Sequence, residues 1–296
     1  MRKALVTGAT GYIGSNLVKK LLDTGWCINI LLREQSDLGL IQDQKNQVQI
    51  HYYDGSVQTM IKVLCNVQPD VVFHLASYFV AEHTSEKIDF LAQSNIILGL
   101  HLLEGMHKSG SNLLINTGTS WQHYNNEDYN PVCLYAATKQ AFEDILAYYV
   151  KAKGIKSITL KLFDTYGSND PRSKLLSLLK KTVESQELLG MSGGEQIINL
   201  VHVKDVVQAF LIGAERLLSD CVTDSEAYAI SAKEHQTVKQ LVAIIEETIN
   251  DKLPILWGER KYREREVMVP WNRGTTLPGW SPEISLRDGL KEYFKS

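Results

Sequence analysis

The sequence has few cysteines, no long apolar run and no excess of charge of one sign. Its four cysteines, Cys27, Cys65, Cys133 and Cys221, are too scattered for a CxxC metal motif or a disulfide framework. We therefore expect structural roles for them, no metal site and a reducing, cytoplasmic location. No apolar run approaches the roughly 20 residues that span a bilayer, and the N-terminus lacks a signal-peptide pattern. The net charge of −3 favours neither a nucleic-acid nor a membrane partner.

Strand-like and helix-like segments alternate through the first 165 residues. Strands are predicted at 4–7, 27–32, 48–53, 71–75, 113–117 and 157–163, and helices at 12–24, 89–108 and 134–153. Strands separated by helices pair in parallel through right-handed crossovers, which predicts an α/β fold with a Rossmann-type doubly wound parallel sheet. We assign residues 1–166 to this domain, expect the segment 197–232 to return to it, and assign 167–296 to a smaller mixed α/β substrate lobe.

A glycine-rich turn joins the first strand to the first helix. Gly8 can take the tight-turn conformation, Gly11 lets the backbone approach a pyrophosphate at the helix N-terminus, and Gly14 allows close packing. The strand–turn–helix context makes this a specific signal rather than a chance glycine triplet. We predict dinucleotide contacts from Gly8, Thr10, Gly11, Tyr12, Ile13 and Gly14.

The end of the second strand indicates which dinucleotide is preferred. Leu32 occupies the position where an acid would bind the ribose hydroxyls, and Arg33 follows it. Arginine pairs with a 2′-phosphate, so NADP(H) is favoured and NAD(H) is the alternative. The alternative interpretation is that Arg33 is a solvated loop residue. Asp54, before Gly55, is either an acceptor for the adenine amino group or the first residue of an Asx turn.

Tyr135 and Lys139 lie one turn apart near the start of a strong helix. An ammonium group favours the phenolate, so Lys139 is expected to lower the tyrosine pKa and permit proton exchange with a carbonyl or alcohol. A hydroxyl at the end of the fifth strand would hold the substrate oxygen. The strand register points to Thr119, which we prefer, whereas counting back from Tyr124 points to Ser120.

These motifs resemble the extended short-chain dehydrogenase/reductases, the NAD-dependent epimerase/dehydratase family. The resemblance covers most of the chain: TGxxGxxG at 7–14, the HLAS segment ending at Ser77, the YxxxK pair, the LFDTYG segment at 162–167 and an HVxDV-like motif at 201–206. It implies cofactor contacts from Tyr135, Lys139, Asp54, Gly55, Leu75, Ala76, Ser77, Asn95 and Phe163, and substrate contacts from Ser120, Arg172, His202 and Arg263. It also implies a possible homodimer, for which Phe142, Ile145, Leu146 and Tyr149 are suitable, although they equally suit sheet packing.

Three departures from the family pattern refine the prediction. The Leu32/Arg33 pair is similar to members that consume NADPH in a net reduction, such as reductases of nucleotide-linked 4-keto-6-deoxysugars. The usual Arg-Asp before the HVxDV motif is Ile198-Asn199, and the asparagine after the sixth strand is Asp164. Arg263 is therefore the first candidate for a diphosphate clamp, because guanidinium binds phosphate bidentately, with Arg172 a weaker one. The alternative interpretation of Arg263 is a surface charge without a role in binding.

We predict an NADPH-dependent reductase of a nucleotide-linked 4-keto-6-deoxysugar. Hydride comes from NADPH, Tyr135 protonates the carbonyl oxygen, Lys139 holds the nicotinamide ribose, and Thr119 orients the oxygen. The first alternative is an NAD-dependent nucleotide-sugar 4-epimerase or 4,6-dehydratase. A dehydratase also needs an acid–base pair beside the hydroxyl, and residues 120–122 contain no carboxylate. The second alternative is a non-catalytic dinucleotide-binding sensor.

Overall fold

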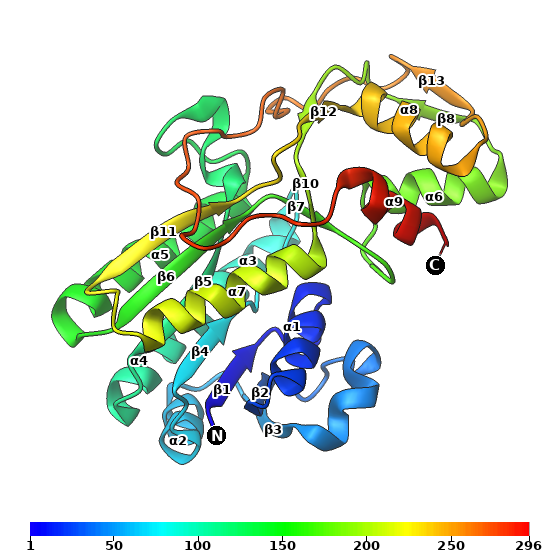
Figure 1. Ribbon diagram of the computed structural model, residues 1–296. Coiled ribbons are helices and arrows are strands. Elements are labelled where there is room, and N and C mark those ends of the chain that lie inside the picture. The colour runs from blue at the N-terminus through cyan, green and yellow to red at the C-terminus, as the bar shows by residue number, and fades with distance from the viewer. Residues whose placement is uncertain (296) are drawn as a thin grey trace.

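The fold is built on a seven-stranded sheet in which every neighbouring pair of strands is parallel. The computed structural model describes residues 1–295. The strand order is β11-β6-β5-β4-β1-β2-β3 (Figure 1). The strands are β1 (Lys3–Thr7), β2 (Cys27–Leu32), β3 (Gln49–Tyr52), β4 (Val71–His74), β5 (Leu113–Thr119), β6 (Lys156–Leu162) and β11 (Ser225–Ile230). The order reverses between β1 and β4, where ligands of such sheets bind at the carboxyl ends.

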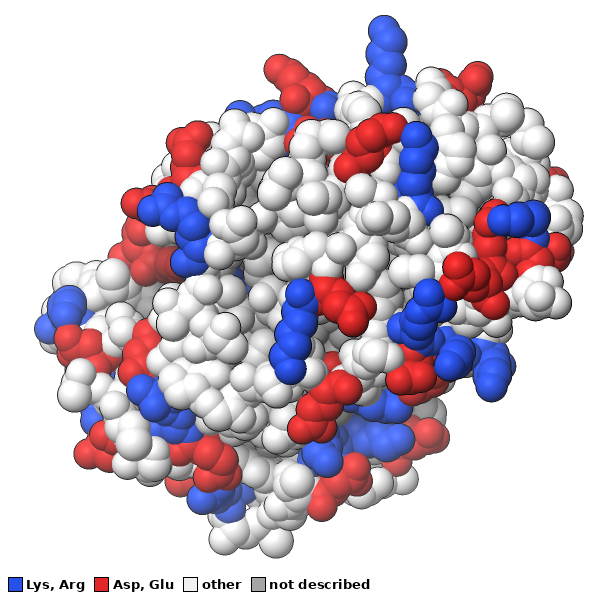
Figure 2. Space-filling model, turned by 45° about the horizontal axis from the view of Figure 1, so that its top comes forward, with Lys and Arg blue, Asp and Glu red and all other residues white. Residues whose placement is uncertain are grey.

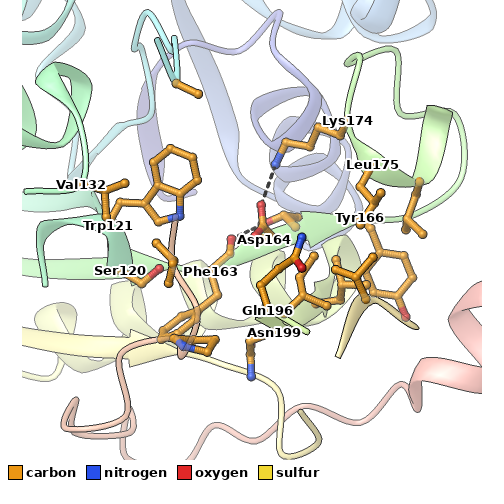
Figure 3. A pocket seen from close by; sticks show the side chains of 18 of the residues that line it. Ser120, Trp121, Val132, Phe163, Asp164, Tyr166, Lys174, Leu175, Gln196 and Asn199 are labelled. Atoms are coloured by element: carbon orange, nitrogen blue, oxygen red, sulfur yellow. Dashed lines mark hydrogen bonds and ion pairs between the residues drawn. The ribbon is translucent and has the colours of Figure 1, made fainter. Parts of the chain in front are cut away.

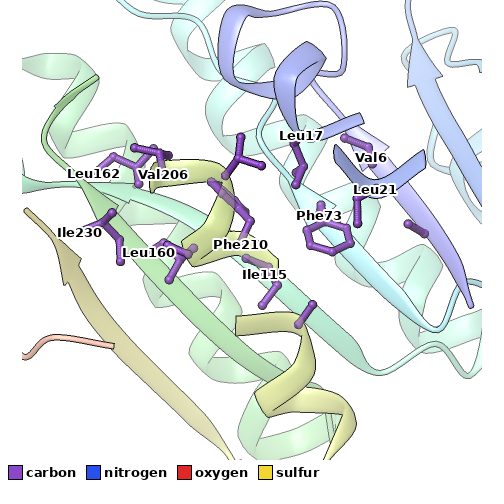
Figure 4. Close-up of a cluster of buried hydrophobic side chains, with 14 of the residues drawn as sticks. Val6, Leu17, Leu21, Phe73, Ile115, Leu160, Leu162, Val206, Phe210 and Ile230 are labelled. Atoms are coloured by element: carbon purple, nitrogen blue, oxygen red, sulfur yellow. The ribbon is translucent and has the colours of Figure 1, made fainter. Parts of the chain in front are cut away.

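Both faces of the sheet are buried because alternate residues of each strand point to opposite helical layers. On one face, Val6, Phe73 and Ile115 pack against α1 (Tyr12–Asp23) and α7 (Val203–Leu218) (Figure 4). On the other face, Leu5, Val72 and Leu114 pack against α2 (Val57–Val67), α4 (Leu98–Ser109) and α5 (Leu134–Lys153). This two-sided burial explains the continuous apolar strands of the sequence and confirms the predicted doubly wound α/β sheet.

The predicted elements agree with the structure except in three places. The helix predicted at 89–108 is interrupted: α3 (Ile88–Ala92) passes into a π-helical turn, Gln93–Ile97, before α4. Two helices were not predicted, α2 and α8 (Val238–Ile249). Both are capped by a hydroxyl, from Ser56 and Thr237, and both carry apolar residues at helical spacing, so their signals were present in the sequence.

A second, smaller core lies at the carboxyl end of the sheet. It is formed by α6 (Leu175–Ser185), α8 and α9 (Leu286–Lys295), with the paired strands β8 (Leu189–Met191) and β13 (Ile255–Trp257). Two short pairs connect the cores: β7 (Asp164–Tyr166) with β10 (Leu200–His202), and β9 (Ile197–Ile198) with β12 (Gln236–Thr237). The remaining short helical turns are Gly39–Gln47, Ser85–Lys87, Ser120–Gln122 and Tyr124–Asn126.

The segment after β10 returns to the large sheet. Helix α7 packs on β5 and β6, and β11 pairs with β6 at the sheet edge. Asp205, in the HVxDV-like motif, then fixes the tail: its carboxylate accepts the N–H groups of Glu283 and Ile284, and its carbonyl accepts the Trp280 indole N–H. The division of the chain at residue 166 stays a prediction.

Basic and acidic side chains are interspersed on the face seen in Figure 2. Within residues 1–295, no helix is both long and apolar enough to cross a membrane. On α5, Phe142, Leu146 and Tyr149 are buried in the core against α2, α4 and the sheet, and Ile145 is partly buried there. These residues thus serve sheet packing, and the homodimer stays a prediction.

Candidate active site

A cavity of about 610 Å³ lies at the carboxyl ends of β1, β2 and β4. Nine residues predicted to bind the cofactor line it: Gly8, Thr10, Gly11, Arg33, Asp54, Gly55, Leu75, Ala76 and Ser77. Further lining comes from Glu34, Gln35, Ser36, Tyr53, Gln93, Ser94 and Leu98, which were not predicted. We refer to this space as the cofactor cavity.

The glycine turn has the close approaches that a dinucleotide site needs. Gly8 has φ +71°, and a Cβ there would lie 2.6 Å from the Ala76 nitrogen. A Cβ on Gly14 would lie 2.0 Å from the Gly8 oxygen. Helix α1 begins after Gly11, which lines the cavity, and its first N–H groups have no side-chain cap. A glycine cradle at an uncapped helix N-terminus fits a pyrophosphate.

A buried hydrogen-bonded chain holds the 75–77 segment beside this turn. The Thr7 hydroxyl lies 2.8 Å from His74 Nδ1 and accepts the Ala76 N–H at 3.1 Å. Thr117 donates to the His74 carbonyl at 2.9 Å. Burial, with the nearby Lys139 charge, lowers the pKa of His74 to about 3, so its ring is neutral at physiological pH.

Seven predicted cofactor residues lie outside the cavity lining: the catalytic pair Tyr135 and Lys139, described below, and Tyr12, Ile13, Gly14, Asn95 and Phe163. Tyr12 donates its hydroxyl to the Ser168 carbonyl, Ile13 packs on the core, Gly14 contacts Gly8, and Phe163 lines a second cavity. Asn95 lies within the π-helical turn. Its amide oxygen accepts from the Ser77 hydroxyl and the Tyr78 N–H, and its amide nitrogen donates to the Tyr78 carbonyl and to Thr138. Asn95 therefore fixes the loop beside the cofactor cavity to the helix that carries Tyr135.

The two residues predicted to recognise the adenosine end lie at the rim of the cofactor cavity. Arg33 is exposed, and its backbone N–H is accepted by the Ser36 hydroxyl at 3.0 Å. No carboxylate within residues 1–295 forms an ion pair with its guanidinium. Asp54 forms an Asx turn, because its carboxylate accepts the Ser56 N–H at 2.9 Å and the Thr59 hydroxyl at 2.9 Å. These contacts lower the pKa of Asp54.

A second cavity, of about 380 Å³, lies between the sheet and the smaller core. Its lining includes the loop after β5, strand β7, the start of α6, residues 196–200 and the tail between Arg263 and Trp271. Figure 3 shows Ser120, Trp121, Phe163 and Asp164 on its wall, with Lys174 reaching toward Asp164. The Trp271 ring stacks on His123, with centroids 3.9 Å apart. We refer to this space as the substrate cavity.

Tyr135 lies where the two cavities meet. Its hydroxyl lies near Ser77, which lines the cofactor cavity, and its ring packs edge-on to Phe79, which lines the substrate cavity. The predicted lowering of its pKa by Lys139 is wrong for this state: burial raises the pKa of Tyr135 to about 12, because desolvation outweighs the effect of Ser77. Tyr135 is therefore a protonated acid at neutral pH.

Lys139 is almost fully buried one turn further along α5. Burial lowers its pKa to about 8, while the nearby carboxylate of Glu143 works in the opposite direction. The ammonium form consequently predominates at neutral pH, next to the tyrosine.

The structure separates the two candidate hydroxyls. Thr119 ends β5, and its hydroxyl accepts the Trp121 N–H at 3.3 Å as the N-cap of the Ser120–Gln122 turn. Ser120 lines the substrate cavity, and Thr119 does not. The fifth strand was predicted to end at residue 117 but extends to Thr119, and the register argument could not show that this last residue serves as a cap.

Every cation of the substrate cavity is already paired with an acid of the same cavity. Arg172 forms a bidentate pair with Asp170, donates to the Thr165 carbonyl, and lies 4.7 Å above the Tyr12 ring centroid. Lys174 lies 3.5 Å from Asp164.

Arg263 pairs bidentately with Glu266, three residues further along the tail, and lies 5.5 Å from the Trp121 ring centroid. Arg172 is thus committed to structural contacts, whereas Arg263 pairs with one carboxylate and otherwise lies over the Trp121 ring.

His202 lies behind the cavity wall. Its ring is buried edge-on against Tyr166, it is not part of the lining, and its Nε2 has no hydrogen-bond partner in the described structure. Its Nδ1 accepts the Lys204 N–H at the start of α7. These contacts give it a structural place in the fold rather than direct access to a ligand.

The fold, the glycine cradle and the Tyr–Lys pair at the sheet switch point define an NAD(P)-binding enzyme of the extended short-chain dehydrogenase/reductase type. The family described as "NAD dependent epimerase/dehydratase family" matches residues 4–221, and the chain belongs to that family.

Relatives of known name span nearly the whole chain. CDP-abequose synthase of Yersinia pseudotuberculosis is 27% identical over 99% of this chain and 98% of its own. The crystal structure of UDP-glucose 4-epimerase from Thermotoga maritima with UDP-glucose superposes with a TM-score of 0.84 at 25% identity, covering 99% and 97% of the two chains. UDP-glucuronic acid 4-epimerase of Bacillus cereus, with UDP-glucuronic acid and NAD, gives a TM-score of 0.85 at 22% identity over 99% and 98%.

Proposed function

We propose that this chain is an NADPH-dependent reductase of a nucleotide-linked 4-keto-6-deoxysugar. The observation that carries the proposal is the rim of the cofactor cavity, where Arg33 has no acidic partner in the described chain and the preceding Leu32 is buried. A free guanidinium at this position can bind the 2′-phosphate of NADPH. In a reductase, NADPH is consumed at each turnover and is not retained. The full-length similarity to CDP-abequose synthase supports the substrate class.

The residues of the chain can carry out the proton half of a reduction. When bound, the dinucleotide supplies a hydride to the carbonyl carbon. Tyr135, protonated because of its raised pKa, donates its proton to the carbonyl oxygen, and the Lys139 ammonium stabilises the phenolate that forms. We assign the orienting hydroxyl to Ser120, because it faces the substrate cavity while Thr119 is engaged as a cap.

The diphosphate of the substrate would lie at the start of α6. Leu175, Leu176 and Ser177 line the substrate cavity there, and a helix N-terminus favours anions. Arg263 is the arginine that can turn from Glu266 to a phosphate, since Arg172 is held by several contacts. Trp121 and Trp271 would then enclose the sugar near Ser120.

Separate titrations with NADPH and NADH, followed by turnover of a 4-keto-6-deoxyhexose linked to CDP or to dTDP, test the proposal. We expect clear preference for NADPH and stoichiometric NADPH oxidation with at least one of the two substrates. Preference for NADH, or NAD that copurifies with the protein, would overturn it.

A nucleotide-sugar 4-epimerase is the second candidate, favoured by the 25% identity and 0.84 TM-score to UDP-glucose 4-epimerase. An epimerase would return the hydride to the same sugar and would therefore retain NAD. Interconversion of UDP-glucose and UDP-galactose without net cofactor consumption would support it over the reductase.

A further inference from the structure

A buried ion pair lies directly behind the wall of the substrate cavity. Glu143 on α5 and Lys161 on β6 approach to 3.3 Å between Oε2 and Nζ, and their side chains are 16% and 8% exposed. Neither residue lines either cavity. A buried ion pair contributes little net stability, since both charges lose their hydration. Its position therefore calls for an explanation other than stability.

Each member of the pair holds one of two consecutive residues in the loop after β5. The Gln122 amide donates to Glu143 Oε1 at 2.9 Å. The Lys161 ammonium lies 3.0 Å from His123 Nε2 and can donate to it, while His123 Nδ1 lies 3.1 Å from the Glu127 carbonyl. Gly118 makes this possible, because a Cβ there would lie 2.9 Å from Glu143 Oε1.

These two contacts reach the turn that presents Ser120. The Gln122 side chain accepts the Thr119 N–H at 3.0 Å, and this hydrogen bond closes the Ser120–Gln122 turn. The His123 N–H donates to the Ser120 carbonyl at 3.1 Å, and the His123 ring forms the wall on which Trp271 stacks. The ion pair thus connects α5 and β6 to both sides of the proposed catalytic hydroxyl.

Glu143 also lies one turn beyond Lys139 and two turns beyond Tyr135 on α5. Its charge raises the pKa of Lys139 against burial. The other titratable groups near Lys139 are Tyr135 on the same helix and His74 on β4, both of them neutral at physiological pH. The Glu143 carboxylate therefore favours the charged form of Lys139.

We propose that Glu143 and Lys161 are positioning residues, whose ion pair fixes the Ser120 turn relative to Tyr135 and Lys139. The proposal rests on the proposed reductase function for its catalytic consequence, but not for its structural one.

Hydrogen exchange measured by mass spectrometry tests the structural part without substrate. Glu143→Leu removes the carboxylate that accepts from Gln122 and pairs with Lys161, and leaves Gln140 as the remaining acceptor for the Gln122 amide. The double variant Glu143→Leu/Lys161→Met also removes the unpaired buried charge, so it folds even where the single variant does not. We expect the amides of residues 119–124 to exchange at least about tenfold faster in the double variant. Glu104→Leu, which loses a half-buried acid bonded to Tyr149 on the far side of α5, is the control and should leave them unchanged. Wild-type protection in the double variant would overturn the proposal.

Kinetics test the catalytic part. We expect kcat of the double variant to fall at least about tenfold with a smaller rise in KM, because the ion pair does not hold Arg263 or the start of α6, which we propose bind the diphosphate. Glu143→Gln keeps an acceptor for Gln122 but loses the charge, so the alkaline limb of its pH profile should move to lower pH. Faster exchange without a change in kcat or in the pH profile would refute the catalytic role. If the wild type reduces no nucleotide-linked ketosugar, the proposed function fails, and the exchange result still decides the positioning.

Discussion

The two cavities differ in the parts of the chain that form their walls. The cofactor cavity is formed by short contiguous stretches at strand ends, 7–11, 31–36, 53–55 and 75–77, together with three residues of the long helical segment, and backbone at glycine positions sets its shape. Its geometry follows mainly from local segments at the carboxyl edge of the sheet. It is preformed, and no ion pair has to open for a ligand to enter.

The substrate cavity is formed by side chains from segments more than a hundred residues apart in the chain. Its three cations, Arg172, Lys174 and Arg263, are each paired with an acid of the same cavity. A charged ligand must therefore exchange partners with the protein before it binds. The comparison indicates that cofactor affinity depends on rigid backbone and substrate affinity on rearrangement of side chains.

Tyr135→Phe should slow the chemical step, which takes place where the two cavities meet. It should not weaken the binding of cofactor or substrate. We expect turnover to fall by about 10³-fold, because the proton donor is lost. Calorimetry should give cofactor affinity within about twofold of the wild type. A variant that retains a tenth of wild-type turnover would contradict the assigned acid.

Ser120→Ala and Thr119→Val are a matched pair at the boundary of the substrate cavity. Loss of the Ser120 hydroxyl should lower kcat by about 10²-fold, the usual effect of removing one oxygen-orienting donor. Thr119→Val removes a cap instead and should lower kcat less than about tenfold while reducing the melting temperature. The reverse order of effects would restore Thr119 as the catalytic hydroxyl.

Arg263→Ala should weaken substrate binding without affecting cofactor binding. KM for the nucleotide sugar should rise about 10- to 100-fold, since a charge-assisted bidentate contact is lost. The affinity for NADPH, titrated alone, should not change. Arg265→Ala, next along the tail and stacked on Tyr124, is the control with a smaller effect on KM.

Arg33→Ala should act on the cofactor cavity alone. We expect NADPH affinity to fall about tenfold, as one exposed phosphate contact disappears, and NADH affinity to stay the same. Equal losses for both dinucleotides would mean that Arg33 contacts the shared adenosine and not the 2′-phosphate.

The pH dependence should be the smallest effect. The lowered pKa of Lys139, about 8, means that its charge is lost as pH rises through that value, while Tyr135 with a pKa of about 12 stays protonated. At saturating substrate, kcat at pH 8.5 should be about fourfold below kcat at pH 7. A flat profile up to pH 10 would remove Lys139 from the step.

The contrast between the cavities also explains what could be predicted from the sequence. The strands and the glycine turn follow from local patterns, which identified Gly8, Thr10, Gly11, Arg33 and Asp54 in the cofactor cavity. The family resemblance added Gly55, Leu75, Ala76 and Ser77. Trp271, Lys174 and the start of α6 carry no local signal, because their role depends on the docking of a distant tail. The pKa of Tyr135 was predicted in the wrong direction, since pairing with Lys139 is visible in the spacing and burial is not. Glu143 and Lys161 lie 18 positions apart, and only the fold shows that they meet.

The order of the lining residues along the chain has a consequence for synthesis on the ribosome. The last residue that lines the cofactor cavity is Leu98, whereas the substrate cavity needs Trp271 and Tyr293, close to the end of the chain. At a synthesis rate of roughly 5–20 residues per second, about ten seconds or more separate Leu98 from Tyr293. A nascent chain thus carries every residue of its cofactor cavity well before it can enclose a substrate, and it gains a closed substrate cavity only when its final helix has been released.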